Sequence, residues 1–485
     1  MKARALKENI LRKLGRVKEA EELHKESLKI DPLYDRQPEK INHNTLLELV
    51  IDLYEAGDYA QGITLAEKWV KQQNVSRQED IYPLVYYYIA YGDQNLHRKE
   101  NTEQANCHMT MYVTLGENAA ADGCFPHRTE DYIVLKSLAE EYHLAMAYYY
   151  LGCLLYDRRV YDESIEDYEE SILRSPDFPT VHRNLALAYY NVKKLPQRAY
   201  EEMEKAFALD ETDARVYLEL DQLKKRLNVA VKERWSDMEK HFDLVESRDD
   251  LYLEYVTLLN TLGEPEKALG LIKARKFHQW EGGEGKVAAQ YLTALYQLAK
   301  AAVEKEDYAE AKELLLRAVG EYPHNLGEGK LESGQENNLY YLLGLVQEKL
   351  GEAKDAFESL TRACCGESEP VGMMYYNDQP PEMIYYQGLA YRMLGEEEQA
   401  VRRFQKLVDY GREHIRDDVK IDYFAVSLPD LLIFEENLNE RNRKHCLFMM
   451  SLGLKGLGRI DEAEKCAEEL LAMDNAHQEI RVHDL

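Results

Sequence analysis

The feature that most constrains this chain is an internal period of 34 residues, clearest over residues 145–178. Within that stretch Gly152 stands at the eighth position, Ser164 at the twentieth and Pro176 at the thirty-second. Small residues at positions 8 and 20 let two helices approach closely, and proline ends the second helix because it cannot donate a helical hydrogen bond. The period therefore predicts a repeated helix–turn–helix unit.

The same phase recurs along most of the chain. Two units near the start are marked by Gly15 and Gly57, and the others occupy residues 179–212, 214–247, 249–276, 292–323, 337–365, 381–408 and 444–474. The unit at 214–247 is degenerate, with Asp221 where a small residue is expected. One helix pair cannot bury its apolar face alone, so neighbouring pairs must stack. We expect an all-α fold, a right-handed α-solenoid of about ten or eleven helix pairs.

The signature positions of these units resemble those of the tetratricopeptide repeat. A longer stretch, from Phe125 to about Leu457, resembles the C-terminal half of large bacterial proteins that join an uncharacterised β-rich N-terminal domain to a tetratricopeptide region. Its markers are residues 175–185, 277–286, 325–330 and 422–430. The resemblance implies a helical repeat fold and brings no catalytic residues.

Breaks in the period divide the chain into four parts. We expect N-terminal repeat-like units with an irregular helical pair over 1–124, a central array over 125–410, an insert over 411–440, and a last repeat with a tail over 441–485. The last long helix is predicted to end near Met473, with a frayed tail from Asn475. The insert has enough apolar residues to fold back into the groove.

The predicted binding surface is the concave groove that the repeat resemblance implies, lined by positions 5 and 12 of each first helix. Position 5 is often tyrosine, whose flat apolar ring and hydroxyl suit binding surfaces. The candidate groove residues are Tyr149, Tyr156, Arg183, Tyr190, Tyr296, Tyr341, Tyr385 and Arg392. These residues are expected to contact a protein or peptide. Alternatively, position 5 packs against the neighbouring unit.

Two Gly-Glu-Gly-Lys tetrapeptides end at Lys286 and Lys330. Each follows a second helix and precedes a first helix, so the two loops should lie side by side on one edge. Their backbone amides could hold an anion near a helix N-terminus; alternatively, glycine only supplies tight turns between repeats. The candidate loop residues are Trp280, Glu284, Lys286, Glu328 and Lys330. A closed pocket lined by Trp280, Glu284 and Glu328 would favour a small ligand.

Charge and composition narrow the function. The net charge of −28 lacks the basic footprint of a nucleic-acid binder and disfavours anionic membranes. Seven scattered cysteines, no apolar signal core and no apolar run of ~20 residues predict a reduced, cytoplasmic protein. The chain carries no GxSxG, HExxH or GxGxxG motif, so we expect no enzyme activity, no cofactor and no metal.

These observations lead to two function hypotheses. The first is a non-catalytic binding scaffold that engages a protein or peptide in its tyrosine-lined groove. The alternative is an accessory module of a carbohydrate-active protein or assembly, which contacts a glycan through the groove aromatics and the glycine loops.

Overall fold

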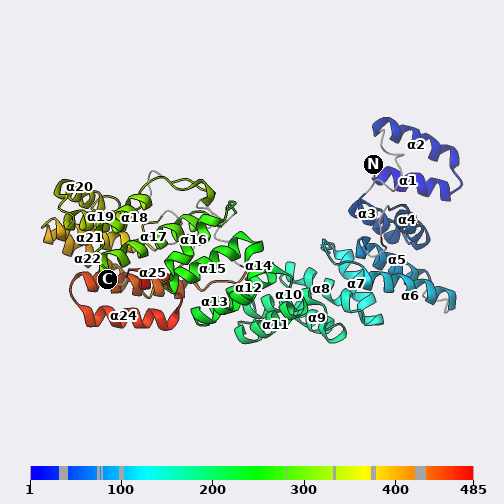
Figure 1. Cartoon of the computed structure of the whole chain (residues 1–485). Helices are drawn as coiled ribbons and strands as arrows, with labels where there is room; N and C mark the ends of the chain where they lie inside the picture. Colours follow the sequence, from blue (N-terminus) through cyan, green and yellow to red (C-terminus); the bar gives the residue numbers. More distant parts are fainter. Residues whose placement is uncertain are drawn as a thin grey trace. The chain divides into compact units, whose positions relative to one another are not determined.

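The chain is described by a computed structural model. The described residues are 2–31, 42–73, 77, 80–97, 103–280, 282–330, 335–372, 378–420 and 433–483. The chain divides into two compact units, Met1–Lys193 and Lys194–Leu485. Every regular element among the described residues is a helix (Figure 1), which confirms the predicted all-α fold.

The first unit contains ten helices within its described residues. They are α1 (Lys2–Lys13), α2 (Val17–Ile30), α3 (His43–Glu55), α4 (Tyr59–Gln72), α5 (Pro83–Leu96), α6 (Glu103–Asn118), α7 (Thr129–Tyr142), α8 (Ala145–Asp157), α9 (Tyr161–Arg174) and α10 (Pro179–Asn191).

The second unit contains the remaining described helices. They are α11 (Pro196–Leu209), α12 (Ala214–Arg226), α13 (Val231–Lys240), α14 (Phe242–Ser247), α15 (Asp249–Thr261), α16 (Pro265–Ala274), α17 (Lys286–Glu304), α18 (Tyr308–Ala318), the 3₁₀ turn η3 (His324–Leu326), α19 (Asn337–Lys349), α20 (Ala353–Ala363), α21 (Pro381–Met393), α22 (Glu397–His414), α23 (Leu438–Gly456), α24 (Ile460–Met473) and α25 (Gln478–Val482).

Consecutive helices pack as pairs, as the period predicts. Among the described residues the first unit holds the pairs α1–α2, α3–α4, α5–α6 and α8–α9, and the second holds α12–α13, α15–α16, α17–α18, α19–α20, α21–α22 and α23–α24. With α10 and α11, which follow one another in sequence, this total matches the expected ten or eleven. The middle of the predicted insert, residues 421–432, lies outside the described residues.

Position 8 of the repeat is small for a steric reason that the structure makes explicit. A Cβ atom at Gly388 would lie 2.4 Å from the ring of Phe404, and one at Gly152 would lie 2.5 Å from the ring of Tyr168. The bulky partner stands at position 24 of the same unit in both cases, and both rings are buried. Glycine on the first helix therefore admits a large side chain from the second, and each pair packs closely.

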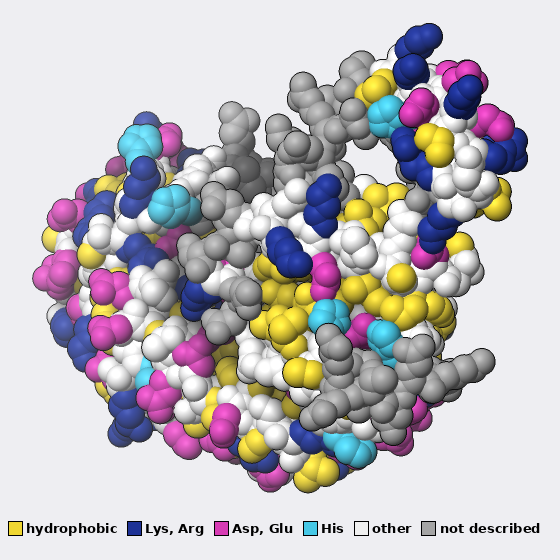
Figure 2. Space-filling view, turned by 90° about the vertical axis from the view of Figure 1, so that its right-hand side faces the viewer, with side chains coloured by type: hydrophobic (Ala, Val, Ile, Leu, Met, Phe, Trp, Pro, Cys, Tyr) yellow, Lys and Arg dark blue, Asp and Glu magenta, His cyan; other side chains and the backbone are white. Residues whose placement is uncertain are grey.

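The visible surface mixes charges of both signs. Figure 2 shows one face on which acidic and basic side chains are interspersed around apolar ones, without a continuous basic area among the described residues. None of the described helices combines the length and the apolar character needed to cross a membrane.

Candidate functional site

The tyrosines predicted at position 5 of the first helices lie in the core. Tyr149, Tyr296 and Tyr385 are only 7%, 1% and 3% exposed. The hydroxyl of Tyr296 lies 2.6 Å from that of Tyr386, and the ring of Tyr149 packs edge-on against Phe178. Position 5 packs against neighbouring helices at these sites. This corrects the expectation that Tyr149 and Tyr385 line an open groove, whereas the ring of Tyr296 is covered both by Tyr386 and by His483, from the C-terminal segment.

The other predicted groove residues are more exposed, and several contact their neighbours. The ring of Tyr341 is partly buried, with its centroid 5.5 Å from that of Tyr386. Arg392 donates hydrogen bonds to Glu397 and to the carbonyl oxygen of Gly456, at 2.8 and 2.9 Å. Partly buried side chains are also found at Tyr156, Arg183 and Tyr190. Four of the eight candidates, Tyr149, Tyr156, Arg183 and Tyr190, belong to the first unit, and the other four belong to the second.

The inner face of the second unit is occupied by residues 475–483, which we call the plug segment. It contains the short helix α25 and contacts the first helices α15, α17 and α21. In Figure 1, α25 lies beside the green helices of the same unit. The predicted frayed tail is therefore wrong for these residues, which are ordered by contacts with helices far away in the sequence.

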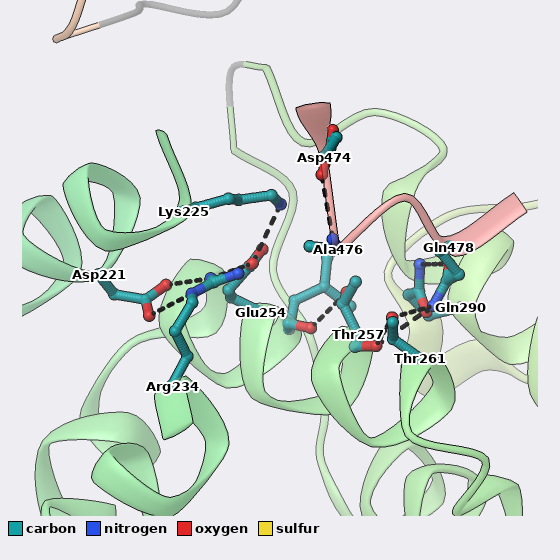
Figure 3. Close-up of polar contacts among 11 residues, drawn as sticks. Asp221, Lys225, Arg234, Glu254, Thr257, Thr261, Gln290, Asp474, Ala476 and Gln478 are labelled. Carbon is teal, nitrogen blue, oxygen red and sulfur yellow. Dashed lines mark hydrogen bonds and ion pairs between the residues drawn. The ribbon is translucent and has the colours of Figure 1, made fainter. Parts of the chain in front are cut away.

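Gln478 anchors the plug segment through its side-chain amide and is only 8% exposed. Its Nε2 donates to the carbonyl oxygen of Thr257 and to the hydroxyl of Thr261, both at 3.2 Å. Its Oε1 accepts from Nε2 of Gln290 at 2.9 Å, as Figure 3 shows. Both functions of the amide are thus used by groups on α15 and α17.

His483 is the second anchor. Its Nδ1 lies 3.1 Å from the hydroxyl of Tyr386, and its ring packs 5.6 Å from that of Tyr296. Burial, with Lys300 and His477 nearby, lowers the pKa of His483 to about 3, so the buried imidazole is neutral at physiological pH. Lys300 also donates to the carbonyl oxygen of Val482 at 3.0 Å.

The start of the plug segment joins the two ends of the second unit. Asn475 donates from its backbone N–H to Oδ1 of Asn228 at 2.8 Å, and Asn228 donates to the carbonyl oxygen of Ala472 at 3.1 Å. Lys194 lies 2.6 Å from the carboxylate of Glu435. The last helix pair therefore returns to the first helices of the unit.

Two buried amide oxygens on this inner face have no partner among the described residues, Oδ1 of Asn260 and Oε1 of Gln297. The other ends of these amides are engaged: Asn260 donates to Oε1 of Gln290 at 2.9 Å, and Gln297 donates to the carbonyl oxygen of Asn260 at 2.9 Å. Buried hydrogen-bond acceptors without a partner are uncommon in proteins, and a bound N–H donor would satisfy these two. Sequence reasoning missed these amides, although Asn260 stands at position 12, one of the two positions expected to face the groove.

A buried ion cluster borders the plug segment (Figure 3). Arg234 is 1% exposed and donates to both carboxylate oxygens of Asp221, at 3.0 and 2.6 Å, and to Glu254 at 2.7 Å. Burial opposes ionisation of Glu254, yet Lys225 and Arg234 lower its pKa to about 2. This cluster explains why the repeat at 214–247 lacks a small residue at position 8. Asp221, which stands at that position, binds the guanidinium of Arg234, so the two helices are joined by an ion pair and not by close backbone packing.

The two glycine loops lie side by side, as predicted. Glu328, from the second loop, accepts hydrogen bonds from the backbone N–H groups of Gly285 and Ala288, at 2.8 and 2.9 Å. These amides belong to the N-terminal turn of α17, where a negative charge is favoured by the helix dipole. The carboxylate of Glu328 therefore caps α17 from within the chain, and it occupies the two amides that were predicted to hold an anion.

The first loop also frames a pocket of about 330 Å³. Gly283 packs against the indole of Trp280, where a Cβ atom would lie 2.3 Å from the ring. The side chain of Glu284 is exposed, as is that of Lys286, whereas Lys330 pairs with Glu336 at 2.8 Å. The pocket is lined by His278, Gln279, Trp280, Gly283, Glu284, Val287, Leu326 and Glu328.

Titratable side chains also gather in the first unit. His108 lies between Asp93 and Glu67, with its ring nitrogens 2.5 and 2.8 Å from the carboxylates, which raise the pKa of the imidazole against the effect of burial. Among the described residues no group of three or more His, Cys, Asp or Glu side chains has an arrangement that could hold a metal ion. The His108 contacts are those of a salt-bridged histidine between two helices.

Comparisons with known proteins agree with this architecture. Tetratricopeptide repeat family models match residues 149–214 and 296–370, and a second such model matches residues 382–410. Similar solved structures include a tetratricopeptide repeat protein from Parabacteroides merdae, at 15% identity over 63% of this chain and 98% of that chain, with a TM-score of 0.24. Yeast Tom70 is similar at 11% identity over 99% of this chain and 93% of that chain, with a TM-score of 0.31. The family-model matches show that the chain contains tetratricopeptide repeats within residues 149–214, 296–370 and 382–410.

Proposed function

We propose that the chain is a cytoplasmic, non-catalytic scaffold that binds a peptide segment of a partner protein along the inner face of its second unit. The proposal depends chiefly on one observation: this face already holds a peptide segment, residues 475–483, through side-chain amides, a lysine and aromatic rings. Tetratricopeptide arrays are a fold typical of protein–protein interaction. The seven cysteines are free thiols, in keeping with a reducing compartment.

The inner face has the chemistry that peptide recognition needs. Asn260 and Gln297 present amide oxygens that a peptide N–H would satisfy, and Lys300 donates to a backbone carbonyl oxygen. These groups would recognise the main chain of a bound peptide. We therefore assign partner binding to Asn260, Gln290, Gln297 and Lys300, with Tyr341 at the edge.

The glycan alternative has less support from the structure. Tyr149 and Tyr385 are buried by neighbouring helices, and Tyr296 is covered by Tyr386 and by His483 of the plug segment, so none of the three has an open ring face on which a sugar could stack. In the glycine loops, the Glu328 carboxylate is already used by backbone amides. The first function therefore remains our proposal.

A peptide library selected against the full chain tests this function. The affinity of a selected peptide is measured for the wild type, for the variant Asn260→Ala/Gln297→Ala, and for the control Lys354→Ala, whose side chain on α20 is 88% exposed. Losing two hydrogen bonds of about 1 kcal/mol each predicts a loss of roughly thirtyfold in the double variant and none in the control. Unchanged binding by a double variant with wild-type helicity would show that the inner face is not the site.

A further inference from the structure

We infer that the plug segment is an exchangeable occupant of the inner face, so that this face recognises a peptide with a glutamine followed five residues later by a histidine. The segment then competes in cis with a partner peptide of the same chemistry. This inference depends on the proposed function and names the partner's chemistry. The spacing is that of Gln478 and His483.

The plug segment has one buried and one exposed side, as a bound peptide has. Its inward side chains, Gln478, Ile480, Val482 and His483, are buried, whereas its outward residues Glu479 and Arg481 are exposed. Helix α25 is only five residues long. A helix that short does not persist alone in water, so its conformation depends on the surface that receives it. The segment is thus ordered by binding.

The inner face forms specific hydrogen bonds with two side chains of the plug segment. The Gln478 amide is held at both ends, by Thr261 and Gln290, and a carboxylate in its place would leave the oxygen of Thr257 or Gln290 without a donor. His483 fits as the neutral imidazole beside Tyr386. Lys300 binds the carbonyl oxygen of the residue before it, a contact that any side chain at that position would allow.

Tethering explains how the segment would compete. Only four residues, 474–477, separate the end of α24 from Gln478. A short tether gives an effective concentration in the millimolar range. A peptide added in trans binds only the fraction of molecules whose plug segment is released, so its apparent affinity falls by that fraction.

The probe is a fluorescent peptide of residues 475–485, and its anisotropy is followed against two proteins, the full chain and a chain that ends at Asp474. We expect the shortened chain to bind the peptide at least about tenfold more tightly than the full chain does, because the tethered competitor is absent. A Gln478→Ala/His483→Ala peptide should bind at least about tenfold more weakly. An Arg481→Gln peptide, altered only on the exposed side, should bind as the wild-type peptide does.

A second variant tests the inference if the shortened chain loses helicity. The full chain carrying Gln478→Ala/His483→Ala retains every residue but has a weakened plug, and it should bind the wild-type peptide more tightly than the full wild-type chain does. The inference is overturned if all the folded proteins bind the wild-type peptide with equal affinity, or if none of them binds it. Loss of helicity in both variants would also overturn it, because the segment would then be structural. Library peptides that bind the inner face while the plug peptide does not would leave the proposed function standing.

Discussion

The ion cluster around Arg234 allows one prediction to be worked through in full. In Arg234→Ala, Asp221 loses the guanidinium that binds both of its oxygens, although its side chain is only 4% exposed. Removing one partner of a buried ion pair costs about 3–5 kcal/mol, because the remaining charge stays buried without compensation. We expect the free energy of unfolding of the second unit to fall by that amount.

A matched double variant separates charge balance from packing. In Asp221→Leu/Arg234→Met both charges are replaced by apolar groups, a change that is often neutral or stabilising by about 1–4 kcal/mol in buried pairs. Glu254 keeps Lys225, whose Nζ lies 3.1 Å away. The double variant should therefore recover most of the stability that Arg234→Ala loses.

Hydrogen exchange measured by mass spectrometry locates the effect, and urea unfolding gives its size. A local loss of 3 kcal/mol corresponds to roughly 150-fold faster exchange in peptides that cover residues 214–240. The reasoning is refuted if Arg234→Ala costs less than about 1 kcal/mol. It is equally refuted if the double variant is as unstable as the single one, since the uncompensated charge would then not be the cause.

Three further predictions follow from the packing and the titrating groups. Gly388→Ala should destabilise the protein by about 1–3 kcal/mol, because the new methyl group would clash with the ring of Phe404. Gly270→Ala, in the middle of α16 where no atom lies within contact distance, should instead stabilise it by up to about 1 kcal/mol. Thermal unfolding compares the two variants, and equal shifts in Tm would contradict the packing argument. Glu328→Ala should lower the free energy of unfolding by about 0.5–2 kcal/mol, because α17 loses its N-terminal cap, and Glu328→Gln should give an intermediate loss. Urea unfolding measures both variants, and an unchanged free energy in both would show that the cap is unimportant. The plug peptide should bind the shortened chain progressively more weakly than its His483→Phe version as the pH falls below about 6.5. The reason is that the free imidazole takes up a proton, whereas the bound imidazole, with a pKa of about 3, stays neutral. The affinity ratio should change by about tenfold between pH 7.5 and 5.5, and a constant ratio over this range would rule the prediction out.

The pairing of helices could be predicted from the sequence because it is a local matter. Gly388 at position 8 and Phe404 at position 24 belong to one repeat, and the same contact recurs between Gly152 and Tyr168 and between Gly344 and Leu360. The adjacency of the two glycine loops is also local, since it spans a single repeat. The same local pattern could not show that Asp221 is matched by Arg234, because the period alone carries no information on which partner replaces a missing small residue.

The site was harder to predict because it depends on distant contacts. Gln478 binds Thr257 and Thr261, more than 200 positions earlier in the chain. Such contacts follow from how far the array curves, which no single repeat encodes. The burial of Tyr296 has the same origin: its ring is covered by Tyr386, on a helix two pairs further along, and by His483 of the plug segment.

The return of the last helix pair to the first has a consequence for how the second unit can evolve. In an open array a repeat can be duplicated or lost, since each repeat touches only its neighbours. Here Lys194 meets Glu435 and Asn228 meets Asn475, so one repeat more or fewer would pull these partners apart. We expect the number of repeats in this unit to be fixed, and the unit to melt as one body instead of unravelling from an end.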